Sequence, residues 1–538
     1  MNIYLLGMCI AMVIYLIIGF VVSKKVKNAD DFYVAGRSAP LLLIAGSMIA
    51  SYTSTGMFMG DAAQCYDGVF TSILIFAGMQ SAGYLIGGVF FGRYLRRSGV
   101  MTIPQFFGRR FCSDRMKKLA AITAIITMTV YLLSVMQGIG TLMNVVTGVD
   151  YKWCIAIALV VFTVITVTSG SRGVLITDTL MAGLFTVAMI FAMFAISGNL
   201  GGWFTAIDKI ASNETFSAML SWGGRTTAWT EGGALPLYAN GMSNVLWGLT
   251  YGVVWMSVCM VGPWQSSRYL MARNEHVVVR SSYASAIGVF LLEFLVGITA
   301  VMVRVANPSL ANSSNVMIWA AMNMMPQLLG VLLLTGVLSA GISSATTFLS
   351  LIGASFANDI FASKEGKSIL YGRIAMIIVS AVVLAVAVVN PPSIFWIMFL
   401  GGAIVASSWM PVALGSIFSK RLTKTGAFCG MLFGFLGCFA VRLYSSLAGV
   451  TLPVYLDPSI IGIVLNVVAM VIGSALTQVS DEEKQARKDL FVMPASECNP
   501  KEMGKTLRYT RWSVLIGVGV TVALLVFWVI PYLRGLAV

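Results

Sequence analysis

One long apolar stretch, residues 332 to 360, carries four hydroxyl side chains in its middle, namely Ser343, Ser344, Thr346 and Thr347. The apolar residues around them predict a membrane-spanning helix, and such a helix satisfies its own backbone hydrogen bonds. The hydroxyl oxygens are then free to bind a partner, and oxygen atoms are the ligands that hard cations prefer. Alternatively, these hydroxyls bond back to their own helix or join neighbouring helices. Spacing alone favours this second interpretation.

A second segment supplies the oxygen atoms that a cation site would still need. The apolar run 41 to 65 is interrupted by two glycines, and an interrupted helix offers backbone carbonyls that have lost their helical partners. Carbonyls near Ala50 and Thr53, the Ala340 carbonyl and the two serine hydroxyls would surround one cation with five oxygens. Sodium is a hard cation of the kind that such a set binds.

Three carboxylates accompany these segments, and each has two open interpretations. Asp178 is either paired or facing water inside a span, or a helix-start residue at the cytoplasmic interface. Glu293 lies deeper and is either a counter-ion or proton relay, or a hydrogen-bond partner of a neighbouring helix. Asp61, at the outer end of the run 41 to 65, either attracts a cationic solute, or caps a half-helix or is solvated.

The elements that position these residues are membrane spans. Of the 538 residues, 58% are hydrophobic and 10% are charged. Apolar runs of about 20 residues recur along the chain, each long enough to cross a bilayer. They predict an all-α integral membrane protein of fourteen spans, at 3–23, 41–65, 70–92, 119–147, 153–169, 174–198, 239–261, 278–303, 325–357, 369–389, 394–418, 426–445, 457–478 and 513–533.

The distribution of basic residues predicts how these spans are oriented. The net charge is +14, and 29 of the 35 Lys and Arg residues lie on one side of the predicted spans. By the positive-inside rule that side is cytoplasmic. We therefore expect a multi-pass protein of the cell (inner) membrane with both termini outside. The partners expected are a small-molecule solute and membrane lipid, with neither nucleic acid nor an obligate protein partner.

Two blocks of five spans carry matching interruptions. Glycines interrupt the first span of each block, at Gly56 and Gly60 and again at Gly248 and Gly252. Paired interrupted helices indicate an inverted-repeat transporter whose site lies at the bilayer midplane. The expected parts are a first helix with a cytoplasmic loop (1–40), repeat 1 (41–198), an extracellular loop (199–238), repeat 2 (239–419), and C-terminal helices (420–538) with a cytoplasmic loop (480–510).

Four short motifs give the chain a resemblance to a known family. The segments DFYVAGRS at 31–38, TIPQFFGRRF at 102–111, SRYLMA at 267–272 and TKTGAFCGM at 423–431 follow one another in the order and spacing of the sodium:solute symporter family. This chain has Ser267 where the family usually has glutamine. The family contains the bacterial proline, pantothenate, sialic acid and galactose symporters, and the resemblance runs nearly end to end.

The resemblance implies a leucine-transporter-like fold of two inverted five-helix repeats plus flanking helices. It also implies a sodium site whose residues match this chain at Ala50, Thr53, Ala340, Ser343 and Ser344. Some members hold a second sodium ion, with ligands that match Asp178, Ser343, Thr346 and Thr347. The family usually has glutamine where this chain has Met181, which leaves the polar surroundings of the second site open.

The solute is expected between the interrupted spans and their neighbours, just outward of the first sodium. Aromatic faces suit apolar parts of a solute and amides suit polar parts. The candidates are Thr55, Met57, Gln80, Gln137, Trp247, Tyr251, Trp255 and Trp409.

We therefore expect a sodium-coupled symporter that imports a small polar organic solute by alternating access. The motif at 177–183 favours a carboxylate or vitamin-type solute such as pantothenate. One alternative is a proton-coupled symporter of the same fold that uses Glu293 or Asp178. Another is a transporter-like solute sensor that acts through a separate partner. An enzyme is not expected, because the chain has one histidine and no paired histidine and acidic motifs.

Overall fold

The computed structural model describes residues 2–24, 28–212, 241–361, 365–389, 393–450 and 452–536, so most of the predicted loop 199–238 lies outside the described residues. Within these ranges the chain folds into helices and forms no β-sheet, which confirms the predicted all-α class. The main helices are α1 (Ile3–Ser23), α2 (Ala29–Val34), α3 (Leu41–Tyr52), α5 (Phe70–Gly87), α6 (Arg93–Ser98), α7 (Ile103–Arg110), α8 (Asp114–Thr147), α9 (Tyr151–Asn199), α10 (Trp203–Ala211), α13 (Gly241–Val261), α14 (Pro263–Met271), α15 (Glu275–Ala306), α16 (Val316–Asn323), α17 (Gln327–Ser355), α18 (Glu365–Val389), α19 (Ile394–Ser408), α20 (Met410–Phe418), α21 (Lys424–Ala448), α22 (Pro458–Ala475), α23 (Asp481–Asp489), α24 (Pro500–Leu524) and α25 (Ile530–Leu536).

The number of spans agrees with the prediction once one broken span is counted. Among the described residues, 13 helical segments are long and apolar enough to cross a membrane. The predicted span 41–65 is not one of them, because it is divided into the short helix α3 and a π-helical segment, Gly56–Asp61. A further short turn, α4 (Ala62–Gln64), connects this segment to α5.

A single bend separates two predicted spans that the structure joins into one long helix, α9. The bend is at Gly170, whose φ of +59° is a conformation that residues with a side chain rarely adopt. The backbone there also runs close to Phe32, since a Cβ on Gly170 would lie 2.7 Å from its ring. The two predicted spans 153–169 and 174–198 therefore meet at a tight packing point against α2.

The predicted interruption at Gly248 and Gly252 is wrong. Helix α13 continues through both glycines and bends only at Gly262, after which α14 begins at Pro263. A Cβ on Gly248 would lie 3.1 Å from the Ser72 carbonyl oxygen of α5. These glycines thus allow α13 and α5 to pack closely, which is the other common use of glycine in membrane helices.

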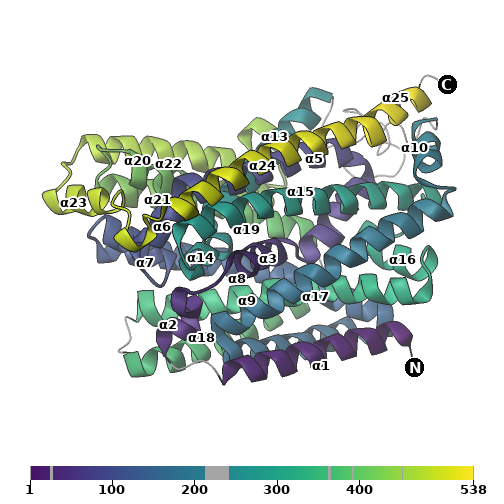
Figure 1. Ribbon diagram of the computed structural model, residues 1–538, viewed down its shortest axis with the longest axis horizontal. Coiled ribbons are helices and arrows are strands. Elements are labelled where there is room, and N and C mark those ends of the chain that lie inside the picture. The colour runs from purple at the N-terminus through teal and green to yellow at the C-terminus, as the bar shows by residue number, and fades with distance from the viewer. Residues whose placement is uncertain are drawn as a thin grey trace.

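The long helices run side by side along the longest axis of the molecule (Figure 1). Both termini lie at one end of this bundle, at the right in Figure 1, while α7 and α23 lie at the opposite end. The basic segment around Arg109 and Arg110 belongs to that opposite end. This arrangement agrees with termini that share one side of the membrane, and their assignment to the outer side stays a prediction.

The break between α3 and Gly56–Asp61 lies inside the bundle. Helices α8, α15 and α19 contact the π-helical segment, and α17 packs against α3 and α8. Helix α17 is the apolar helix with the four hydroxyl groups, and nearly all of its residues beyond Leu333 are buried. The interior of the bundle therefore brings the broken span and the hydroxyl cluster together.

Candidate functional site

The helical hydrogen-bond ladder of α3 ends at Thr53. The Thr53 N–H donates to the Ile49 carbonyl over 2.8 Å, and Thr53 itself is extended, with φ −69° and ψ 100°. The Ser54 hydroxyl then accepts a hydrogen bond of 3.0 Å from the Gly56 N–H. Serine side chains stabilise turns in this way and compete with the helix. The break thus precedes the two glycines, whereas the sequence pattern placed it at Gly56 and Gly60.

Two hydroxyl groups beside this break lack a hydrogen-bond partner. Thr53 Oγ1 and Ser344 Oγ are unpartnered, and both residues are fully buried. A buried polar group without a partner costs about 1–3 kcal/mol. These two oxygens would therefore gain most from a bound cation.

Helix packing brings Ser344 to the side of α17 that faces the break. A Cβ on Gly341 would lie 2.9 Å from Cγ2 of Thr55, so this turn of α17 touches the broken segment. Residues three apart share one face of a helix, which places Ser344 on the same side. Ala50 and Ala340, the other predicted contributors, are fully buried on the contacting helices α3 and α17. All of the donor atoms are oxygens, which suits sodium.

Asp178 lies in the interior and is a hydrogen-bond acceptor for several groups. It is fully buried and sits within α9, well past the bend. Ser343 Oγ donates to Asp178 Oδ1 over 2.6 Å, and Ser47 Oγ donates to Oδ2 over 2.5 Å. The interpretation of Asp178 as a helix-start residue at the cytoplasmic interface is therefore wrong, because helix packing buries it against α3 and α17.

The cation beside Asp178 is the guanidinium group of Arg268, which belongs to the motif SRYLMA at 267–272. Arg268 Nη2 donates to Asp178 Oδ2 over 2.9 Å and to Thr347 Oγ1 over 2.6 Å. Its Nε donates to Ser47 over 2.9 Å. Arg268 is 1% exposed, so this cation lies inside the bundle. A buried arginine needs a carboxylate partner, and only the packing of α14 on α3 and α17 shows that Asp178 is that partner.

The residues predicted for a second sodium site are thus brought together in part. Asp178 reaches Ser343 directly and Thr347 through Arg268. Thr346 Oγ1 instead donates to the carbonyls of Ile342 and Ser343 on its own helix, each over 3.0 Å. For Thr346 the helix-bonding alternative therefore describes the structure.

Two of the solute candidates belong to a stack of aromatic rings on α13 and α19. The rings of Trp247 and Tyr251 lie 4.0 Å apart, and those of Tyr251 and Phe399 lie 3.9 Å apart. Phe395 stacks on Tyr251 at 5.6 Å. The two phenylalanines were not predicted, because their places in an apolar run give no sign of which side faces α13.

A second group surrounds Tyr131, a residue of α8 that sequence reasoning missed. Its ring lies 6.2 Å from Trp255, and its hydroxyl shares a hydrogen bond of 3.1 Å with Ser54 at the break. Trp255 also lies edge-on to Tyr52, whose hydroxyl donates to the Gln80 side chain. The candidates Gln80 and Trp255 are therefore linked to the broken span through Tyr52 and Tyr131.

The other solute candidates have different surroundings. Met57 is buried in the π-helical segment. Thr55 Oγ1 donates to the Val135 carbonyl over 3.2 Å, and Gln137 Oε1 accepts from the Ser393 N–H over 3.0 Å. Trp409 donates to Thr123 Oγ1 over 2.9 Å and packs on Phe107 of α7. The structure thus places Trp409 with α7, apart from the two aromatic groups described above.

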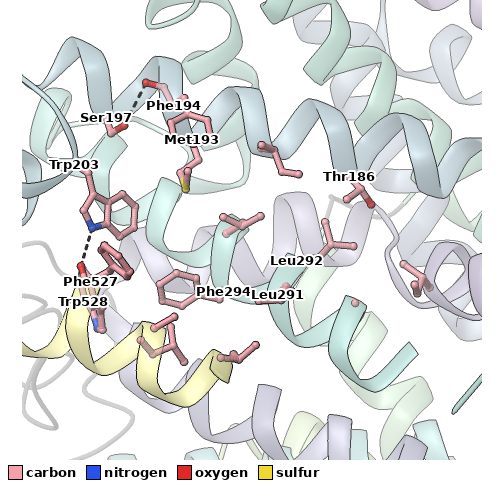
Figure 2. A pocket seen from close by; sticks show the side chains of 17 residues that line it. Thr186, Met193, Phe194, Ser197, Trp203, Leu291, Leu292, Phe294, Phe527 and Trp528 are labelled. Carbon is pink, nitrogen blue, oxygen red and sulfur yellow. Dashed lines mark hydrogen bonds between the residues drawn. The ribbon is translucent and has the colours of Figure 1, made fainter. Parts of the chain in front are cut away.

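The candidate residues pack against one another, and a large cavity lies elsewhere. An apolar cavity of about 510 Å³ opens between α9, α15 and α24 (Figure 2). Trp203 closes one side of it, where its indole N–H donates to the Phe527 carbonyl over 2.7 Å. None of the candidate site residues lines this cavity. The aromatic candidates are at most 2% exposed, so the central site is closed in this structure.

Comparisons with known proteins identify the family of this chain. The sequence profile of the sodium:solute symporter family matches residues 32–434. The sodium/proline symporter of Salmonella typhimurium is 24% identical, and the match covers 80% of this chain and 86% of that protein. The sodium/proline symporter of Haemophilus influenzae is 25% identical, with 82% and 86% covered.

Solved structures show the same fold. A sodium-coupled sialic acid symporter in a substrate-bound, outward-open state superposes with a TM-score of 0.72 at 17% identity, covering 89% of this chain and 99% of that one. A nucleobase-cation-symport-1 family transporter, Mhp1, in a closed conformation gives a TM-score of 0.55 at 14% identity, covering 86% and 99%. The predicted leucine-transporter-like fold is confirmed. The chain belongs to the sodium:solute symporter family and is therefore a multi-pass, sodium-coupled symporter rather than an enzyme.

Proposed function

We propose that this symporter couples the influx of one sodium ion to the uptake of a small polar organic solute. The sodium site consists of the Ala50, Thr53 and Ala340 carbonyls with the Ser343 and Ser344 hydroxyls. The observation that carries this proposal is the pair of buried, unpartnered hydroxyls, Thr53 Oγ1 at the break after α3 and Ser344 Oγ on the α17 face directed at this break. The bounds of the two repeats stay the predicted ones.

The surroundings of Asp178 support one sodium ion rather than two. Arg268 already neutralises the carboxylate that a second sodium would need. Ser343 Oγ donates its hydrogen to Asp178. The lone pairs of Ser343 Oγ point away from that bond and are available to the first sodium site. A second sodium bound by Asp178, Ser343, Thr346 and Thr347 would require Arg268 to move away from Asp178. Two sodium ions per cycle stay the alternative stoichiometry.

The break after α3 explains how sodium binding would be coupled to solute binding. Sodium bound between α3 and α17 ties the two repeats together, and this favours the conformations in which both sides of the site are assembled. A bound ion shifts such an equilibrium only through its different affinity for the two states. The half-helix that starts at Gly56 then carries Met57 and its neighbours toward the solute.

Two solute classes are consistent with this site. The sequence motif favours a carboxylate or vitamin-type solute such as pantothenate. The named relatives are sodium/proline symporters, which suggests an amino-acid-type solute instead. The solute would lie among Met57, Gln80, Tyr251 and Trp255, where rings and one amide meet.

Proton coupling is the nearest alternative, and its two predicted carriers have different surroundings. Asp178 is held in an ion pair with Arg268, whereas neither carboxyl oxygen of Glu293 has a hydrogen-bond partner. Glu293 is therefore the better proton carrier. A solute sensor that acts through a separate partner remains the other alternative. Placement in the inner membrane with both termini outside is part of the proposal.

The function is tested in two steps. Purified protein is first screened for thermal stabilisation by solutes in sodium chloride and in potassium chloride, because a bound solute raises the melting temperature by mass action. The best solute is then labelled and its uptake into right-side-out vesicles is measured at fixed pH. We expect accumulation that requires an inward sodium gradient. Accumulation driven by a proton gradient without sodium, or binding without accumulation, would contradict the proposal.

A further inference from the structure

Two buried carboxylates, Asp61 and Glu293, lie on segments that contact each other in the interior. Asp61 ends the π-helical segment and is 3% exposed, while Glu293 lies in the middle of α15 and is 1% exposed. The turns that follow these two residues touch, since a Cβ on Gly297 of α15 would lie 3.1 Å from Cys65 Sγ. Within the described part of the chain neither of them forms an ion pair with a lysine or arginine. Two such charges cannot both persist in an apolar interior unless a cation neutralises them.

The polar atoms around this pair are unpartnered. Both carboxyl oxygens of Glu293 and Oδ1 of Asp61 have no hydrogen-bond partner. The fully buried side chain of Gln80 lies beside Glu293, and its Nε2 is also unpartnered. Gln80 thus adds an amide beside the two carboxylates, and its carbonyl oxygen already accepts the Tyr52 hydroxyl hydrogen. Buried polar atoms without a partner destabilise the protein, and a ligand that pairs with them removes this cost.

The pair adjoins the aromatic stack of the solute site. The backbone at Gly60, next to Asp61, runs along Phe395, since a Cβ there would lie 3.4 Å from the Phe395 Cα. Phe395 in turn stacks on Tyr251. On the other side, Gln80 accepts the Tyr52 hydroxyl hydrogen, which connects Glu293 to the ring of Trp255 through Tyr52. Packed side chains therefore connect the carboxylates to both aromatic groups.

We propose that Asp61 and Glu293 bind the ammonium group of an amine-bearing solute. The inference rests on the proposed symport function and names the class of its solute. A primary ammonium has three N–H donors, and the pair offers three unpartnered acceptor oxygens. One positive charge neutralises one carboxylate, while the other carboxyl keeps its proton. The neighbouring rings favour a cation further. A purely anionic solute such as pantothenate is repelled here.

Thermal stabilisation of the full-length purified protein tests this proposal. The probes are primary amines (propylamine, ethanolamine, putrescine and L-alanine), each matched with an alcohol or carboxylate of similar size, in sodium or potassium chloride. We expect at least one amine, and not its matched alcohol, to raise the melting temperature by about 2 °C or more when it saturates the site. Asp61→Asn and Glu293→Gln should each lower the affinity for that amine at least about 10-fold.

Asp67→Asn is the matched control, because Asp67 lies in the next turn, where its carboxylate accepts a hydrogen bond from Ser313 over 2.8 Å. It should leave the amine response unchanged. The proposal is overturned if no amine stabilises the wild-type protein. It is also overturned if both carboxylate variants respond to the amine as the wild-type protein does. The wild-type result decides even where a variant fails to fold. If sodium chloride without any solute fails to raise the melting temperature of the wild-type protein above its value in potassium chloride, the proposed function itself is refuted instead.

Discussion

Replacing Ser344 by alanine should change stability in opposite directions in the presence and absence of sodium. The Ser344 hydroxyl is fully buried and has no hydrogen-bond partner. Burying such a hydroxyl costs about 1–3 kcal/mol. Ser344→Ala removes that cost, so in potassium chloride the variant should melt at the wild-type temperature or above it.

In sodium chloride the order should reverse. If Ser344 Oγ is a ligand of the ion, its loss removes an interaction with a charged group, worth about 1.5–3 kcal/mol. That energy corresponds to a sodium affinity weakened between about 10-fold and 150-fold. The wild-type protein should therefore gain stability at sodium concentrations that leave the variant unaffected.

The measurement is the melting temperature of purified protein as sodium replaces potassium at constant ionic strength. Ser350→Ala is the matched control, because Ser350 is buried on the same helix and contacts Ser171 rather than the break. It should keep the wild-type sodium midpoint. The assignment of Ser344 as a sodium ligand is refuted if Ser344→Ala keeps that midpoint too, or loses equal stability in both salts.

Three further predictions concern the framework of the site. Asp178→Asn should leave the buried Arg268 unpaired and lower stability by about 3–5 kcal/mol, measured as a loss of melting temperature and yield, while the double variant with Arg268→Gln should recover part of it. Gly83→Ala should destabilise the protein by about 1–3 kcal/mol, because the new Cβ would collide with backbone atoms of α13, while Gly78→Ala on the same helix has open space and should be neutral. Gly170→Ala should lower the melting temperature through its positive φ and its contact with α2, and an unchanged temperature would show that the bend can relax.

The sequence by itself determined the membrane fold. Hydropathy and helix length are local properties, so the long spans could be predicted from their own residues. The hydroxyl cluster of α17 could also be predicted as a site, because polar atoms inside an apolar helix are conspicuous without any knowledge of their neighbours. The glycines of span 41–65 also predicted a break there, but the same pattern predicted a break in α13 that the structure does not have.

The tertiary structure alone decided which groups meet at the site. The place of the break, at Thr53 rather than at the glycines, depends on the Ser54 hydroxyl and on the helices that enclose it. The pairing of Arg268 with Asp178 joins two segments about ninety residues apart, and the same is true of Tyr131 and Ser54 over a shorter separation. Which faces of two helices touch depends on the packing of the whole bundle. A single sequence specifies each helix, but not which buried charge will lie against which partner.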